Sequence, residues 1–408
     1  MHTEIEVSTP SAAPSTASRG KFSGHIPALD GIRGLAILTV TAYRFSIGPD
    51  DNRLPGKLLF NALHHGDLGV DLFFVLSGFL ITGILFDAKG EDHYFRNFYA
   101  RRALRIFPLY YGFLFVTLVA LPFLFGSRFD LFPEAKANQA WLWLYGANIL
   151  MSIRDEWCLG SFTHFWSLSV EEHFYLIWPL VIFFSSRRIA MLASLFAIAF
   201  SVVGRIVWIR LGGGEVAVET FTLFYLDGLA IGSLIALAVR GPGGVQPLIR
   251  WAFIAAILSG ATMLGIALLP NERLLDLPTL VIAIFFGSLL VLAVASRKST
   301  LWGIFWRSKV LSFFGKYSYA MYVFQLPLIR ILDPIFSAEG LCLRLGSIFY
   351  GRILYIALMM AITTALAYLS WHLYEKHFLR LKVYFESAPS PITRSPISLR
   401  SSDERRSQ

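Results

Sequence analysis

Several stretches of this chain carry no charged residue over a length that can cross the hydrocarbon core of a membrane. The clearest are residues 108–126, 251–270 and 277–296. A transmembrane helix needs about 20 apolar residues, and it satisfies its own backbone polar groups in lipid. Only 15% of the residues are charged, whereas a soluble domain usually has about 25%. The sequence therefore predicts an all-α, polytopic transmembrane helix bundle and no soluble core.

Ten apolar windows are candidates for membrane spans, which predicts about ten crossings. An eleventh apolar stretch, 139–153, is too short, and its length favours an interfacial or re-entrant piece. The ten windows are 28–48, 68–86, 108–126, 164–185, 189–209, 221–239, 251–270, 277–296, 311–333 and 350–373.

The basic residues between these windows predict the orientation of the bundle. With both termini in the cytoplasm, the loops at 89–105, 187–188 and 297–309 are cytoplasmic and rich in Arg and Lys. The external loops 212–220 and 270–276 are poor in both residues, as the positive-inside rule requires. We attribute the net charge of +9 to basic loops that set the orientation in the membrane and attract anionic lipids. We do not read it as a nucleic-acid-binding surface.

Both ends of the chain are polar. Residues 1–24 and 386–408 are rich in Ser and Pro, so we expect two disordered tails around a membrane domain at 25–380. The first 24 residues lack the apolar core of a cleavable signal peptide. Cys158 and Cys342 both fall in external loops, where we expect two free thiols in preference to a disulfide.

Charged residues inside the apolar windows are the informative ones, because a charge at the membrane centre costs about 2.5–3.5 kcal/mol even on the lenient insertion scale. The first window holds Arg33 and Arg44, eleven residues apart, which places them on one helix face. Two snorkelling anchors are the alternative reading. In the second window, Asp71 could serve a site or simply pair with Arg44. Ser77 precedes a glycine near mid-span, where packing is the alternative to a site.

Arginines and aromatic residues alternate in the stretch YFRNFYARRALRIFPLYY. Read as a helix, it is basic on one side, lies in the cytoplasmic interface plane and ends at Pro108. A positive-inside anchor is the plain interpretation, and a phosphate-binding patch is the sharper one, because guanidinium groups match phosphate. The basic residues are Arg96, Arg101, Arg102 and Arg105.

Two adjacent carboxylates, Glu171 and Glu172, lie in the apolar stretch HFWSLSVEEHFYLIWP between His164 and His173. Adjacent helical residues point about 100° apart, so at most one of the two can face a given cavity. A carboxylate and an imidazole on nearly one face could act as acid and base, although a structural pair is also possible. Asp227 is a further charge within a window. No spacing of ligands supports a metal site.

Several motifs together resemble the acyltransferase-3 family of integral-membrane O-acyltransferases. They occur in the family's order over residues 25–380. The matching stretches are LDGIRGLAIL (29–38), GVDLFFVLSGFLIT (69–82), FYARRALRIFPLYY (98–111), HFWSLSVEEHFYLIWPL (164–180), LDGLAIGSLIAL (226–237), GKYSYAMYVFQLPLI (315–329) and YEKHF (374–378).

The resemblance implies a multi-pass enzyme of the cell (inner or plasma) membrane. Such an enzyme moves an acyl group, often acetyl, from cytoplasmic acyl-CoA to a hydroxyl of a cell-surface glycan or lipid-linked sugar, without a metal. The expected catalytic residues are Glu171, His164, Arg44 and Asp71. The expected donor-binding residues are Arg33, Arg101, Arg102 and Arg105, and the expected substrate or core residues are Ser77, Glu172, His173, Tyr175 and Asp227.

Three positions depart from the family's pattern. The family usually has a His, thought to be the general base, where this chain has Arg44, and Arg cannot take a proton at neutral pH. Gln325 also stands where His is frequent, and Tyr225 stands where Arg is common. Either another base is used, with His164, His65 and Glu171 as candidates, or the chain is an inactive or repurposed relative, for example a glycan or lipid transporter or export subunit.

Overall fold

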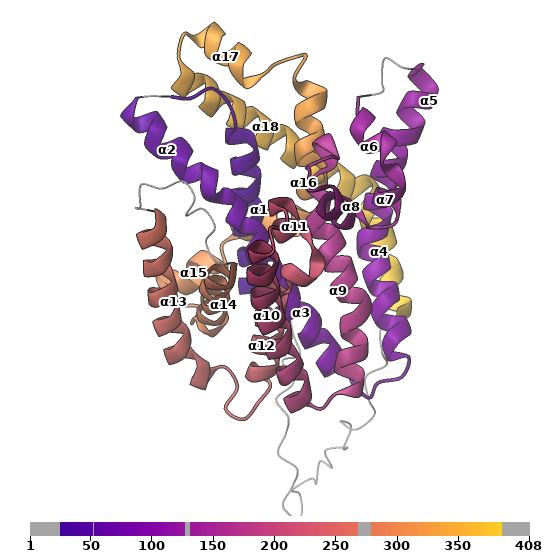
Figure 1. Ribbon diagram of the computed structural model, residues 1–408, viewed down its shortest axis with the longest axis vertical. Helices are drawn as coiled ribbons and strands as arrows, with labels where there is room; N and C mark the ends of the chain where they lie inside the picture. The colour runs from indigo at the N-terminus through magenta and orange to yellow at the C-terminus, as the bar shows by residue number, and fades with distance from the viewer. Residues whose placement is uncertain (1–24, 52, 127–130, 268–278, 386–408) are drawn as a thin grey trace, which may run out of the picture.

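The computed structural model describes residues 25–51, 53–126, 131–267 and 279–385, and the regular structure within these ranges is entirely helical (Figure 1). The two expected tails and the expected external loop at 270–276 lie outside the described residues.

Ten helices correspond to the ten apolar windows. They are α1 (Pro27–Ser46), α3 (Gly69–Asp87), α4 (Tyr94–Leu114), α9 (Phe165–Phe184), α10 (Arg187–Arg210), α12 (Leu226–Val239), α13 (Gln246–Ala267), α14 (Thr279–Ala295), α16 (Lys309–Leu332) and α18 (Ile348–Ser370). The prediction of an all-α bundle of apolar helices is confirmed for the described residues.

Six helical segments are long and apolar enough to cross a membrane. They contain α3, α4, α9, α10, α13 and α18. The helices α12 and α14 are apolar but shorter. The remaining two, α1 and α16, carry charges within their length and pack along each other.

Short helices connect the long ones, and in Figure 1 several of them gather at the upper end of the bundle. They are α2 (Leu54–His64), α5 (Leu121–Phe125), α6 (Pro133–Ala137), α7 (Gln139–Trp143), α8 (Ala147–Arg154), α11 (Glu215–Thr220), α15 (Leu301–Trp306), α17 (Ala338–Leu345) and α19 (Lys376–Arg380). The stretch 139–153 forms α7 and α8, which break at Tyr145 with its positive φ of 53°. Neither helix is long enough to span a membrane, in agreement with the expectation.

The prediction that the basic helix ends at Pro108 is wrong. The helix α4 continues through Pro108, and a π-helical stretch (Phe115–Ala120) joins it to α5. It therefore belongs to a continuous helical segment, Tyr94–Phe125, that is long and apolar enough to cross a membrane. Proline at 108 removes the N–H donor for the carbonyl four residues earlier, that of Leu104, and such a loss is tolerated inside transmembrane helices.

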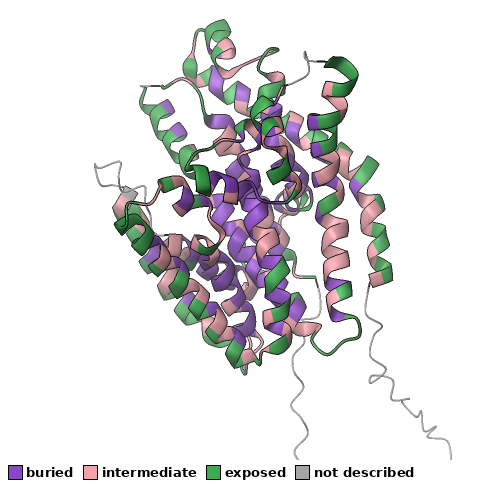
Figure 2. Cartoon of the chain, turned by 45° about the vertical axis from the view of Figure 1, so that its right-hand side comes forward, coloured by how far each residue is buried: buried purple, intermediate pink, exposed green. Residues whose placement is uncertain are grey.

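The centre of the bundle is α3, and α13 lies at the periphery. Most of the α3 segment is buried, whereas α13 is the least buried of the membrane-spanning candidates. Figure 2 shows the same contrast, with buried residues concentrated in the middle of the molecule and exposed ones along the outer helices.

Two pairs of central helices run parallel. Along α3 and α12, Tyr225 contacts Asp71 at one end and Arg240 pairs with Asp87 at the other. Along α1 and α16, Gly34 meets Leu311, and Phe45 shares an apolar cluster with Leu328 further along both helices.

Glycine makes these parallel contacts possible. A Cβ atom on Gly78 would lie 1.9 Å from the carbonyl oxygen of Leu229 in α12, and one on Gly34 would lie 2.0 Å from that of Leu311 in α16. Small residues allow helix backbones to approach closely in membranes, which confirms the packing role considered for the glycine after Ser77. The two cysteines, Cys158 and Cys342, are free thiols, as expected.

Replacement of Gly78 by Val should separate α3 from α12, because the new side chain would collide with the Leu229 backbone. We expect a loss of about 1–3 kcal/mol or more of stability, as for overpacked cores, measured as a lower thermal unfolding midpoint in detergent. Gly265 in α13 has no atom within 4 Å of a built Cβ, so Gly265→Val is the matched control. Equal midpoints for the two variants would contradict the close-packing argument.

Candidate functional site

A cavity of about 470 Å³ lies among α1, α3, α4, α9 and α16 and reaches the C-terminal segment Leu381–Phe385. Its wall follows α3 from Val70 to Ile84, a distance of about 21 Å at the helical rise of 1.5 Å per residue. The cavity therefore extends over much of the thickness of the hydrocarbon core.

Positive charge dominates one part of the cavity wall. Five cationic side chains line the cavity and only one carboxylate, that of Glu171, does so. Cations gathered in a partly buried space favour an anionic ligand, and arginine is especially suited to phosphate. The five are Arg33, Arg101, Arg102, Arg105 and Lys382.

The four arginines are those expected from the sequence to bind the donor, and they meet in this one cavity. On α4, Arg101 and Arg105 are one turn apart, so one helix face carries both. Lys382 was not among the expected site residues, because in the sequence it is only one of several basic residues that follow the last window. No pattern in that stretch shows that its chain folds back to the cavity.

Internal contacts hold the arginines without neutralising all of them. Arg33 pairs with Asp30 at 3.2 Å, and the Nε of Arg101 donates to the carbonyl of Asn97 at 3.2 Å. The Arg102 guanidinium lies 4.0 Å from the ring centroid of Tyr175. A cation–π contact orients the guanidinium but leaves its charge available. Tyr175, expected to be a core residue, thus supports the cationic part of the wall.

Ser77 and Glu171 form the polar contact in the middle of the cavity. The Ser77 hydroxyl on α3 donates to Glu171 Oε1 on α9 at 2.5 Å, and both residues line the cavity. Glu172 does not line it, which agrees with the expectation that only one of the adjacent carboxylates can face a given space. Glu171 is therefore a carboxylate that can accept a proton inside the cavity.

Tyr322 and Ser167 close the cavity on the side away from the arginines. Their hydroxyl oxygens are 2.6 Å apart, and the Tyr322 hydroxyl also contacts the carbonyl of His164 at 2.9 Å. The His164 ring lies behind Tyr322, with 5.3 Å between ring centroids, and is only 1% exposed. Neither His164 nor Arg44 lines the cavity. Sequence reasoning missed both Tyr322 and Ser167, although Ser167 stands one turn before Glu171.

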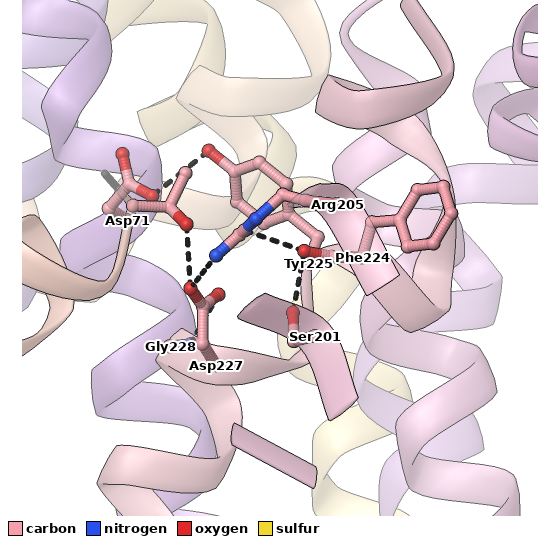
Figure 3. A network of polar contacts seen from close by, with 8 residues as sticks. Asp71, Ser201, Arg205, Phe224, Tyr225, Asp227 and Gly228 are labelled. Carbon is pink, nitrogen blue, oxygen red and sulfur yellow. Dashed lines mark hydrogen bonds and ion pairs between the residues drawn. The ribbon is translucent and has the colours of Figure 1, made fainter. Parts of the chain in front are cut away.

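Asp71 and Asp227 belong to a separate buried network (Figure 3). Asp71 accepts a hydrogen bond from the Tyr225 hydroxyl at 3.0 Å, so the pairing with Arg44 that the sequence allowed is not formed. Asp227 pairs with Arg205 at 2.6 Å and accepts from Thr279 at 2.6 Å. Arg205 was overlooked, although a charge within an apolar window is itself a signal.

The remaining expected residues also lie outside the cavity. The Nδ1 atom of His173 is 2.7 Å from the Thr222 hydroxyl, in the segment that leads to Tyr225. His65 is exposed in a short 3₁₀ helix, His65–Leu68. The four expected catalytic residues therefore do not converge on one cavity, and only Glu171 lines it. Among the described residues, no group of three His, Cys, Asp or Glu side chains could hold a metal ion.

The family model and the similar proteins all point to acyltransferases. A family model of an acyltransferase domain, acyltransferase 3, matches residues 26–372. The chain is 28% identical over 381 residues to YrhL of Bacillus subtilis, described as a putative peptidoglycan O-acetyltransferase, over 86% of this chain and 54% of that protein. It is 26% identical over 336 residues to the O-acetyltransferase OatA of Staphylococcus aureus, over 76% of this chain and 52% of that protein.

A third relative, the peptidoglycan O-acetyltransferase OatA of Listeria monocytogenes, is 34% identical over 163 residues, which cover 38% of this chain and 24% of that protein. The chain thus spans about half the length, or less, of these curated relatives. No solved structure matches the chain.

If coenzyme A is the donor, as the motifs imply, the cationic part of the cavity wall is the place where we expect it to bind. We expect Arg102→Gln and Arg105→Gln each to raise the Kd for coenzyme A about tenfold, because a hydrogen bond to a charged group contributes about 1.5–3 kcal/mol. Isothermal titration calorimetry on the full chain in nanodiscs measures this. Arg96 lies on the same helix but is exposed and outside the cavity, so Arg96→Gln is the control. An equal effect of all three substitutions would argue against a specific site.

Proposed function

The chain belongs to the acyltransferase-3 family, as its motifs predict, and from this we propose that it is an integral-membrane O-acyltransferase. In this proposal it transfers an acyl group, often acetyl, from cytoplasmic acyl-CoA to a hydroxyl of a cell-surface glycan or lipid-linked sugar. The observation that carries the proposal is the cavity in which five cations surround one end and the Ser77–Glu171 pair lies further along.

The donor fits the cationic end because coenzyme A carries several phosphate groups. Arg33, Arg101, Arg102, Arg105 and Lys382 would bind them, and the pantetheine arm would follow the cavity along α3 toward Glu171. Phosphates held at one end and a thioester delivered about two helical turns away would place the reacting carbon by binding alone, which is a large part of the rate advantage in group transfer.

We propose ten spans, with both termini in the cytoplasm and the membrane domain at 25–380 between tails at 1–24 and 386–408. The parallel pairs support this count. In a ten-span order, α1 and α16 are the first and ninth spans, and α3 and α12 are the second and sixth, so the members of each pair run in the same direction. Counting 139–153 as a span would make both pairs antiparallel, against the observed contacts.

The proposed reaction is a transfer from sulfur to oxygen. The acceptor hydroxyl attacks the thioester carbonyl carbon, a C–O bond forms and the C–S bond breaks. The hydroxyl proton passes to Glu171, whose carboxylate Ser77 orients, and Glu171 then returns this proton to the departing thiolate, which leaves as free coenzyme A. Arg102, whose charge acts on Glu171, would stabilise the oxyanion of the tetrahedral intermediate. In this scheme Glu171 replaces the histidine base that Arg44 cannot provide.

The relatives support the proposed acceptor and location. Two are named as peptidoglycan O-acetyltransferases, so a glycan acceptor is the closest analogy for this chain. A multi-pass protein with this role belongs in the cell membrane, where its basic loops also contact anionic lipids. The alternative, a glycan or lipid transporter or export subunit, would move its solute without consuming acyl-CoA.

The proposal predicts that nanodiscs containing the full chain consume radiolabelled acetyl-CoA when a membrane glycan fraction is added, and that acetyl esters appear on the glycan by mass spectrometry. Glu171→Gln should lower the rate about 10²–10⁴-fold, the usual contribution of a general base. Glu172→Gln alters the neighbouring carboxylate outside the cavity, so it should retain at least tenfold more activity than Glu171→Gln. Glycan or lipid transport without turnover of acetyl-CoA would favour the alternative.

A further inference from the structure

A second set of buried polar groups lies beyond Tyr322, outside the cavity. Their side-chain atoms are inaccessible to solvent and make no hydrogen bond within the part of the chain that the structure describes. Most buried polar atoms in proteins are hydrogen-bonded, so a group of exceptions calls for an explanation such as a bound ligand. The atoms are Thr41 Oγ1, Arg44 Nε, both ring nitrogens of His164, both amide atoms of Gln325, and Thr363 Oγ1.

The positions of α1 and α16 place Arg44 and Gln325 at the same height in the bundle. The two helices run parallel and touch where Gly34 faces Gly315. Arg44 and Gln325 each lie ten residues beyond that contact, about 15 Å further along their helices. Thr41 lies one turn before Arg44, and Gln325 is completely buried.

The helices α9 and α18 complete this layer. His164 is the N-cap residue of α9, and its ring lies against the Tyr322 ring. Tyr322 is one turn before Gln325 on α16. The charge of Arg44 is close enough to act on the His164 ring. Thr363 on α18 stands one turn from Met359, which packs in the apolar cluster of Phe45 and Leu328. That cluster lies directly beyond the layer on the side away from the cavity.

The charge of Arg44 has no partner in this layer. Among the described residues it makes no ion pair, and its guanidinium lies over the Tyr43 ring at 4.9 Å. Asp71 accepts a hydrogen bond from Tyr225 and Glu171 accepts one from Ser77, and neither forms an ion pair with Arg44. Asp67 is exposed, accepts from the backbone of Leu68, and is close enough for its charge to act on Arg44 without an ion pair. Arg44 is only partly exposed and its Nε is buried without a hydrogen bond, so an anionic ligand is a natural complement.

We propose that this layer binds the acceptor, and that the acceptor carries a carboxylate or phosphate group that pairs with Arg44 while Gln325 and His164 bind its hydroxyls. This inference rests on the proposed function and narrows its acceptor to acidic glycans. Tyr322 lies between the layer and the cavity, so an acceptor held in the layer would extend its reacting hydroxyl past the edge of this ring to the donor. Arg44 and Gln325 stand where the family often has histidine. This replacement suits an anionic sugar, because the guanidinium binds a carboxylate or phosphate bidentately.

Acceptor pairs that differ only in charge test the proposal. The full chain in nanodiscs receives acetyl-CoA with a uronic-acid oligosaccharide, its carboxyl-reduced form, or a sugar phosphate of similar size. We expect the KM of the wild type to be at least tenfold lower for an acidic acceptor than for the reduced one. Comparison of the uronic-acid oligosaccharide with the sugar phosphate shows whether the carboxylate or the phosphate is preferred. Arg44→Gln should abolish the preference through KM and leave the Kd for coenzyme A unchanged, and Arg44→Lys should keep part of it.

Arg330 is an exposed arginine on α16, and Arg330→Gln should behave like the wild type. Equal KM values of the wild type for charged and reduced acceptors would overturn the inference, as would an unchanged preference in Arg44→Gln. If no acceptor supports consumption of acetyl-CoA, the proposed function fails by itself. Calorimetric binding of the uronic-acid oligosaccharide, without donor, then still tests the layer: tenfold weaker binding to Arg44→Gln than to the wild type supports it, and equal binding overturns it.

Discussion

Direct contact between helix backbones sets the heights at which all other side chains in this bundle meet. The contacts of Gly34 with α16 and of Gly78 with α12 allow no side chain between the helices, so neither pair can slide by a turn without a collision. Because both pairs are parallel, residues further along one helix lie at the height of residues further along the other. The cavity, the buried network and the unpartnered layer all depend on these heights.

Charges inside the bundle are treated in two different ways. Arg205 and Asp227 neutralise each other at 2.6 Å and receive further hydrogen bonds from their surroundings, so they form a closed structural unit. The five cations of the cavity face a single carboxylate among its described lining residues, and Arg44 makes no ion pair in the described part of the chain. An unpaired charge inside a membrane protein is costly. An unpaired charge is therefore a stronger indication of ligand binding than a charge that is already paired.

Much of the architecture follows from sequence, because span length and loop charge are properties of short segments. The ten windows, the short 139–153 stretch and the arginines of one helix face needed only helical periodicity and hydropathy. The errors arose where a distant residue decides the outcome. Asp71 takes Tyr225, which lies on another helix, as its partner in place of Arg44, and α4 continues through Pro108 as part of a longer helical segment. Lys382, Tyr322 and Ser167 join the cavity through packing that no local pattern reveals.

The hydrogen-bonded contact between Tyr322 and Ser167 also has a consequence for the membrane itself. A cavity about 21 Å long that opened at both faces would conduct protons and small ions and would discharge the membrane potential. The Tyr322 ring on α16 and the Ser167 hydroxyl on α9 lie between the cavity and the polar layer beyond it, where they would interrupt such a pathway. The bundle can therefore hold a deep polar space and remain electrically tight.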